Sequence, residues 1–163
     1  MGTAVRGKVK RMGYRRILWP TDFSALAKAA LPHAVGLASD AGAELILLHV
    51  LPPPSAYAVP EIPGSLWVRL QRTTRAAAQT KLRRLEQQVT GPNFRTHTVL
   101  TEGVPSLQIL RAAKRLRCDL IVLATHGRTG LAHAIMGRLA ENVIRRAPCP
   151  VLAVHPSSLQ RDR

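Results

Sequence analysis

Five short apolar segments are spaced along the chain, and each is bounded by glycine, proline or polar residues. An unbroken apolar run is typical of a strand that is buried on both faces of a parallel sheet, and the run ELILLHVL is the clearest example. The third segment instead alternates and is rich in Thr and Val, which also favours a strand. The predicted strands are residues 17–19, 44–51, 94–100, 120–124 and 151–154.

Between these segments apolar residues recur every three or four positions, a spacing that predicts helices. We expect helices over residues 25–41, 66–89 and 105–116, and a fourth from Arg138 until Pro148 ends the pattern. Ser24 is a suitable N-cap for the first helix, and Pro32 inside that helix should kink it or reduce its stability. The residues predicted to face the core are Leu26, Ala30, Ala34, Leu37 and Ala41 in the first helix, Leu66, Leu70, Thr73, Ala77, Leu82, Leu85 and Val89 in the second, and Leu107, Leu110 and Ala113 in the third.

Strands and helices alternate strictly along the sequence. Such alternation predicts an α/β fold with a parallel sheet and right-handed crossovers. The length of 163 residues favours one domain, which we place at residues 14–156. Residues 1–13 are predicted to form a mobile basic arm, and residues 157–163 a polar tail.

The fourth strand leads into a loop that carries a candidate nucleotide site. The loop contains Gly127 and Gly137, and the next helix begins at Arg138. Glycine lets backbone N–H groups approach a phosphate chain, and the helix N-terminus adds a positive end. The stretch therefore predicts a phosphate site at the carboxyl ends of the strands, where parallel α/β sheets bind ligands. Tight turns between strand and helix would also account for both glycines, and a turn after the first strand would account for Asp22.

The formal net charge of +15 is large for this length. It is compatible with an anionic partner such as a nucleotide, a nucleic acid or a membrane surface. The charge comes mostly from arginine and is spread over the whole chain, so a solvated arginine-rich surface is the competing interpretation. Aromatic residues make up only 4% of the sequence, which argues against base stacking and leaves nucleic-acid binding as a weak electrostatic possibility.

Several classes of protein are disfavoured by the sequence. The start of the chain is basic but lacks the apolar stretch of a secretory signal, and no apolar run is long enough for a membrane span. The two cysteines have neither metal-ligand spacing nor a disulfide pattern, so we expect a cytoplasmic protein. We find no Walker A pattern, nucleophile elbow or paired carboxylates, and therefore no residue placed for catalysis. Slow ATP hydrolysis or autophosphorylation stays open.

Several segments in order resemble the universal stress protein family. They are ILWPTDFS at the first strand, LILLHV at the second, the turn GVP, then DLIVLATHGRTG and GRLAENVIRRAPCPVLAV. The resemblance covers roughly residues 14–155. It implies a Rossmann-like, doubly wound sheet of five parallel strands in the order 3-2-1-4-5, with helices on both faces. It also implies frequent homodimers and, in one subgroup, bound ATP.

The ATP-binding subgroup has a motif of Gly, two residues, Gly, nine residues, Gly, then Ser or Thr. That pattern falls here on Ala124, Gly127, Gly137 and Arg138, so two glycines and the nine-residue spacing match. The Ala124 methyl group is expected to crowd the ribose. Arg138 replaces a phosphate-binding hydroxyl and offers a charged fork of donors in its place.

The resemblance also implies a set of ligand-binding residues for ATP. Asp22 could help to hold Mg²⁺ with the phosphates, since Mg²⁺ often takes few protein ligands. Asp22 and the Val50 backbone would bind adenine, and residues near the glycines would lie beside the ribose and phosphates. The candidate site residues are Pro20, Thr21, Asp22, Val50, Leu123, Ala124, His126, Gly127, Arg128, Gly137, Arg138, Leu139 and Ala140.

Two hypotheses of function stay open on the sequence alone. In the first, the chain is a stress-response protein that senses an adenine nucleotide. In the second, Ala124 and Arg138 have removed nucleotide binding, and the chain is an interaction module. The strand at residues 151–154 would then lie at a sheet edge and pair with a second copy.

Overall fold

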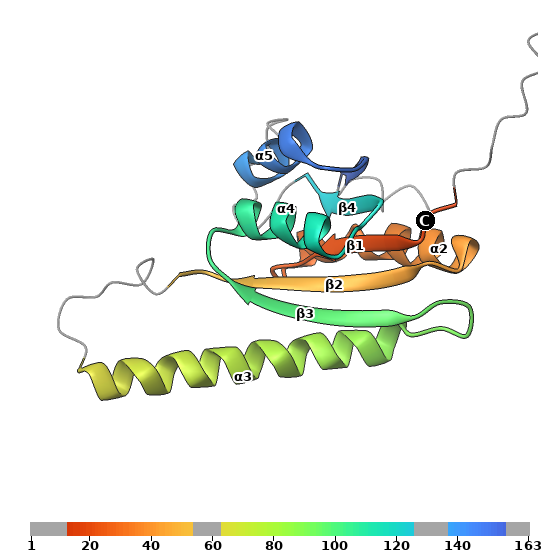
Figure 1. Cartoon of the computed structure of the whole chain (residues 1–163). Helices are drawn as coiled ribbons and strands as arrows, with labels where there is room; N and C mark the ends of the chain where they lie inside the picture. Colours follow the sequence, from red (N-terminus) through yellow and green to blue (C-terminus); the bar gives the residue numbers. More distant parts are fainter. Residues whose placement is uncertain (1–12, 54–62, 126–136, 156–163) are drawn as a thin grey trace, which may run out of the picture.

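A computed structural model describes residues 13–53, 63–125 and 137–155 (Figure 1). Strands and helices alternate through these residues, as the apolar pattern predicts. The elements are β1 (Arg16–Pro20), α1 (Ala25–Lys28), α2 (Leu31–Ala41), β2 (Glu44–Leu51), α3 (Gly64–Val89), β3 (Thr96–Glu102), α4 (Pro105–Arg115), β4 (Leu120–Ala124), α5 (Arg138–Arg146) and β5 (Val151–Val154).

The five strands form one parallel sheet in the order β3-β2-β1-β4-β5. β1 lies at the centre, where Leu18 pairs with Ile46 of β2 on one side and Ile121 of β4 on the other. The order reverses between β1 and β4, because the chain first builds outward through β2 and β3 and then returns. The predicted α/β fold and strand order are confirmed.

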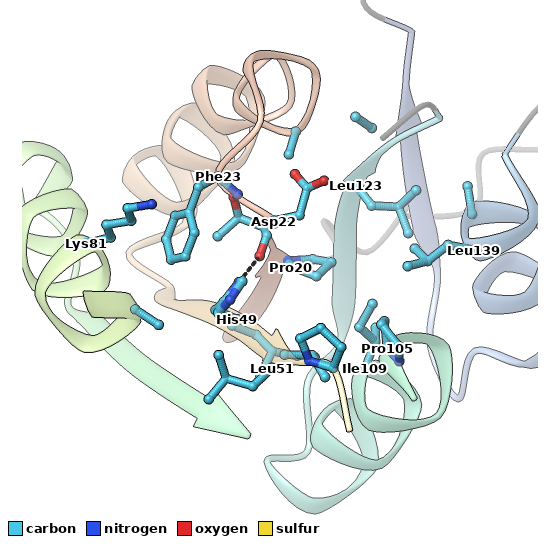
Figure 2. Close-up of a pocket in the computed structure, with 18 of the residues that line it drawn as sticks. Pro20, Asp22, Phe23, His49, Leu51, Lys81, Pro105, Ile109, Leu123 and Leu139 are labelled. Atoms are coloured by element: carbon cyan, nitrogen blue, oxygen red, sulfur yellow. Dashed lines mark hydrogen bonds between the residues drawn. The ribbon is translucent and has the colours of Figure 1, made fainter. Parts of the chain in front are cut away.

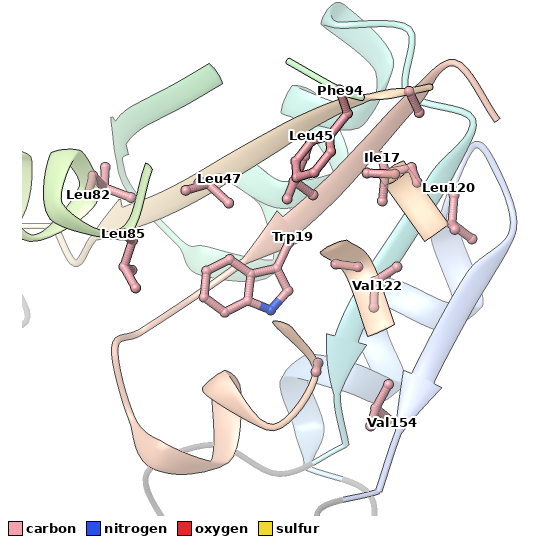
Figure 3. Packing of buried hydrophobic residues seen from close by; sticks show 14 residues of the cluster. Ile17, Trp19, Leu45, Leu47, Leu82, Leu85, Phe94, Leu120, Val122 and Val154 are labelled. Carbon is pink, nitrogen blue, oxygen red and sulfur yellow. The ribbon is translucent and has the colours of Figure 1, made fainter. Parts of the chain in front are cut away.

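Two apolar clusters lie on opposite faces of the sheet, so the fold is doubly wound. Ile17 and Trp19 of β1 belong to the cluster that contains buried residues of α2 and α3, such as Ala34 and Leu82 (Figure 3). Leu18, which points the other way along the same strand, belongs to the cluster built with α4 and α5. Burial on both faces explains why the inner strands β1, β2 and β4 are apolar runs, whereas the edge strand β3 alternates and is only partly buried.

The first predicted helix is in fact two helices. α1 ends at Lys28 and α2 begins at Leu31, with Pro32 in the first turn of α2. Proline is compatible with that position because the first N–H groups of a helix lack intrahelical acceptors. The break also shifts the buried face, so that Ala41 is exposed while Ala38 is buried, and the predicted inward set is partly wrong. The buried residues of the two helices and their junction are Ala27, Ala29, Ala30, Ala34 and Ala38.

The predicted core stripe of α3 is wrong in its first half. Leu66 and Leu70 are exposed, at 53% and 46%, whereas Leu82 and Leu85 are buried. α3 is 26 residues long, and Figure 1 shows its first turns extending beyond the sheet, so only its later turns pack on the strands. Leu107 in the first turn of α4 is likewise exposed rather than inward, since the face that packs on the sheet carries Ile109, Ala112 and Ala113.

Candidate functional site

A cavity of about 520 Å³ opens at the carboxyl ends of β1, β2 and β4 (Figure 2). It reaches both faces of the sheet, because α3 lines one end while α4 and α5 line the other. Nine of the thirteen candidate site residues surround it: Pro20, Thr21, Asp22, Val50, Leu123, Ala124, Gly137, Leu139 and Ala140. The strand order brings these distant segments together, because the order reverses between β1 and β4.

The structure does not show the remaining four candidate residues at the cavity. His126, Gly127 and Arg128 fall outside the described residues. Arg138 is the first residue of α5 and is exposed, and it does not line the cavity. Its guanidinium is therefore not among the groups that shape the site in this structure.

Hydrogen bonds to β2 and within the loop hold the loop after β1 in place. Thr21 N–H donates to the Leu48 carbonyl at 2.8 Å, which keeps the loop on β2. Phe23 N–H donates to Thr21 Oγ1 at 3.0 Å. Phe23 has a φ of 64°, a left-handed conformation that costs a residue with a Cβ roughly 1–2 kcal/mol. The surrounding contacts hold the loop in this conformation.

Asp22 both lines the cavity and caps the turn after β1. Its Oδ1 accepts a hydrogen bond from Ser24 N–H at 2.9 Å. Ser24 in turn is the predicted N-cap of α1, and its Oγ accepts from Ala27 N–H at 3.0 Å. Asp22 therefore does have the turn role that the sequence suggests as an alternative to ligand binding. Its carboxylate still lies at the cavity wall in this turn.

At the far side of the cavity, the chain returns to the end of β4 in close contact. Gly137 N–H donates to the Thr125 carbonyl at 2.9 Å. A Cβ at Gly137 would lie 3.3 Å from that carbonyl oxygen, tighter than ordinary contact. The close approach of the Gly137 and Thr125 backbones therefore explains the glycine at this position. The same contact places the N-terminus of α5 beside the cavity.

The sequence does not identify several residues that line the cavity. Its pattern indicates only an ordinary polar residue at a strand end for His49, and it does not point to Phe23, Lys81 or Thr74. The Lys81 ammonium lies 5.4 Å from the centre of the Phe23 ring, in the range of a cation–π contact. The sequence could have indicated His49, because it precedes the candidate residue Val50 at the end of the same strand, and both residues line the cavity. The α3 residues carry no comparable local signal.

The described residues hold no metal cluster and no membrane-crossing helix. No group of three or more His, Cys, Asp or Glu side chains is arranged there to bind a metal ion. None of the helices in that part of the chain combines the length and the apolarity that a membrane span requires.

Both cysteines are free, and the more buried one has a perturbed thiol. Burial raises the pKa of Cys118 to about 12 from its ordinary value of 9.0, with smaller contributions from the charges of Cys149 and Asp119. Burial also raises the pKa of Cys149. Neither thiol has the lowered pKa that is typical of a reactive cysteine.

This shift predicts a loss of stability at high pH. Between pH 9 and 12 the Cys118 thiol loses its proton in the unfolded chain but keeps it in the folded chain. The free energy of unfolding should therefore fall as pH rises, by at most about 1.4 kcal/mol per pH unit from this group. Urea unfolding from pH 8 to 11 tests this, with Cys118→Ala as the comparison. If the free energy of unfolding fell equally steeply with pH in both proteins, the raised pKa of Cys118 would be contradicted.

Comparison with known proteins identifies the family. The model of the universal stress protein family matches residues 13–155. Universal stress protein MJ0531 of Methanocaldococcus jannaschii is 33% identical over 86% of this chain and 82% of its own. The structure of MJ0577, from the same organism, is 29% identical, with a TM-score of 0.77 over 88% of this chain and 96% of its own. A universal stress protein in complex with cAMP shares the fold at 23% identity, with a TM-score of 0.61 over 89% of this chain and 99% of its own. The chain belongs to the universal stress protein family.

Proposed function

We propose that the chain is a cytoplasmic stress-response protein that binds ATP or a related adenine nucleotide in this cavity. One observation carries the proposal: nine candidate residues from four separate segments line a single cavity where the strand order reverses. Ligand binding there would bias the conformation of the surrounding loops and so report nucleotide levels to a partner.

The walls of the cavity suit a nucleotide. Leu123 and Leu139 offer apolar surface for a base or ribose, and the Asp22 carboxylate offers an acceptor for its N–H or O–H groups (Figure 2). α5 begins at the cavity rim, and its N-terminal end favours negatively charged phosphates. Mg²⁺ would bind to those phosphates and to water, because this ion keeps several waters and takes few protein ligands.

The relatives support the same ligand class. The universal stress protein whose structure is described as a complex with cAMP has this fold, so the fold accommodates an adenine nucleotide in that protein. In the present chain the Ala124 methyl group lies at the cavity wall where the ATP-binding subgroup has glycine. We propose that Ala124 narrows the ribose position without closing it, because alanine adds only one carbon.

A thermal shift assay with a charge control tests the proposed function. At a hundredfold excess over Kd, ATP should raise Tm by about 5–10 °C, because it binds only the folded chain. Tripolyphosphate carries the phosphate charge without the nucleoside and is the control, since a chain with a net charge of +15 also attracts simple anions. Equal shifts with both compounds would assign the effect to charge and contradict nucleoside recognition.

The edge of the sheet favours a second role, in which the protein forms a homodimer through β5. β5 pairs only with β4 among the described strands, and Leu152 on it is 36% exposed. An apolar edge strand is a natural site for pairing with a second copy. We expect sedimentation at micromolar concentration to show a dimer, and Leu152→Asp to shift it towards monomer. A wild-type monomer would contradict this interface.

A further inference from the structure

His49 lies close to the end of β2 and contacts the loop that carries Asp22. The side chain is buried, with 8% of its surface exposed. Its Nδ1 lies 2.7 Å from the Thr21 carbonyl oxygen (Figure 2). A carbonyl oxygen only accepts, so Nδ1 carries the hydrogen and donates it. This bond joins β2 to the backbone immediately before Asp22.

The ring of His49 also supports the residue after Asp22. The Phe23 ring lies against it with centroids 4.3 Å apart and planes tilted by 34°. Phe23 has the left-handed φ of 64°, a conformation that a non-glycine residue keeps only where its surroundings determine it. The His49 ring is one of those surroundings, and the Thr21 hydroxyl that accepts from Phe23 N–H is another.

The two contacts therefore fix both neighbours of Asp22. The Nδ1 bond fixes the carbonyl of Thr21, and the ring contact fixes the side chain of Phe23. With both flanks held, the Asp22 carboxylate is confined between the cavity and the turn to Ser24.

We propose that His49 is a positioning residue for the ligand site, which acts on the nucleotide through Asp22. The inference rests on the proposed function, because it concerns binding of a nucleotide by Asp22. It also makes a claim about the chain without ligand: His49 keeps the Thr21–Ser24 loop in its observed conformation.

Two polar substitutions test the Nδ1 hydrogen bond separately from the ring. Both remove the ring, and only one keeps a donor for the Thr21 carbonyl. Asparagine places its amide nitrogen near the position of Nδ1, so H49N keeps a donor for the Thr21 carbonyl. Glutamine places its amide nitrogen farther out, near Nε2, so H49Q loses that donor while it keeps a polar side chain of similar size. His97, an exposed histidine on β3, provides the matched control H97Q.

The first measurement uses the protein without ligand. Amide hydrogen exchange of Phe23 and Ser24 reports the loop, because their N–H groups donate to Thr21 Oγ1 and Asp22 Oδ1. We expect H49Q to speed their exchange by about tenfold, the size of effect for losing one buried hydrogen bond. H49N keeps a donor but loses the ring that lies against Phe23, so it should speed the exchange by less than H49Q. H97Q should leave it near wild type. Unchanged exchange in H49Q would overturn the inference.

The second measurement is a double-mutant cycle on ATP affinity. H49Q should weaken ATP binding by about tenfold in the wild-type background. In the Asp22→Ala background it should add less than about threefold, because a residue that acts through Asp22 has little left to position. The same loss in both backgrounds would overturn the inference, since His49 would then act independently of Asp22. Failure of the wild-type protein to bind ATP would contradict the proposed function instead, and the exchange experiment would still decide the role of His49 in the loop.

Discussion

Replacing Trp19 with alanine should lower the free energy of unfolding by about 3–5 kcal/mol, the largest single-residue effect that we expect on stability. Trp19 lies on the central strand β1 and is fully buried. Its indole packs in the cluster between the sheet and the helices α2 and α3, together with Leu47 and Leu85 (Figure 3). Removal of the ring leaves a cavity that residues on a central strand cannot close. Urea unfolding followed by circular dichroism measures the loss.

The other tryptophan provides the matched control. Trp67 lies near the start of α3, where it is only partly buried and the helix extends beyond the sheet. Trp67→Ala should therefore cost about 1 kcal/mol or less. Similar losses for the two variants would show that the first turns of α3 are buried in solution, or that the core around Trp19 relaxes. Either result would contradict the packing described here.

Replacing Asp22 with alanine should weaken ATP binding by about 10- to 100-fold, the largest effect that we expect on ligand affinity. The carboxylate lines the cavity and would accept a hydrogen bond from the nucleoside as a charged group. Because Asp22 Oδ1 also accepts from Ser24 N–H, the alanine variant additionally loosens the turn. Calorimetric titration with ATP gives the affinity of each variant.

Two further variants separate these contributions. Asp22→Asn keeps an oxygen for Ser24 N–H but removes the charge, so an affinity that falls in both variants assigns the loss to the carboxylate. Glu102→Ala removes an exposed acidic residue at the end of β3, outside the cavity, and should leave binding unchanged. Unchanged affinity in both Asp22 variants would contradict the placement of the nucleotide.

The strands are the part of the fold that the sequence predicts best. β2, β4 and β5 occupy the predicted residues. β2 and β4 are unbroken apolar runs because both of their faces are buried, whereas β5 is a short apolar run at the sheet edge. Helix faces are predicted less well, because spacing alone does not show where a helix leaves the sheet or restarts. Leu66 fits the apolar period of α3 and is exposed, since the strands do not extend that far beneath it.

The candidate site is predictable where it depends on strand ends. Asp22, Val50 and Ala124 lie at or just after the ends of three strands, and the strand order brings them together. Lys81 is not predictable in this way, because its place at the cavity depends on how a whole helix packs. The role of Phe23 is also hidden in the sequence, because its left-handed backbone and its contact with His49 are tertiary features.

An NMR titration of the wild-type protein with ATP tests nucleotide binding at the strand ends most directly, because it reports binding and location together. Any nucleotide that co-purifies is removed first, and tripolyphosphate serves as the reference for simple charge attraction. We expect saturable one-site shifts in the amides of Asp22, Val50, Thr125 and Ala140 that tripolyphosphate does not reproduce. Absence of saturable shifts, or shifts spread over the arginine-rich surface away from the strand ends, would contradict nucleotide binding in this cavity.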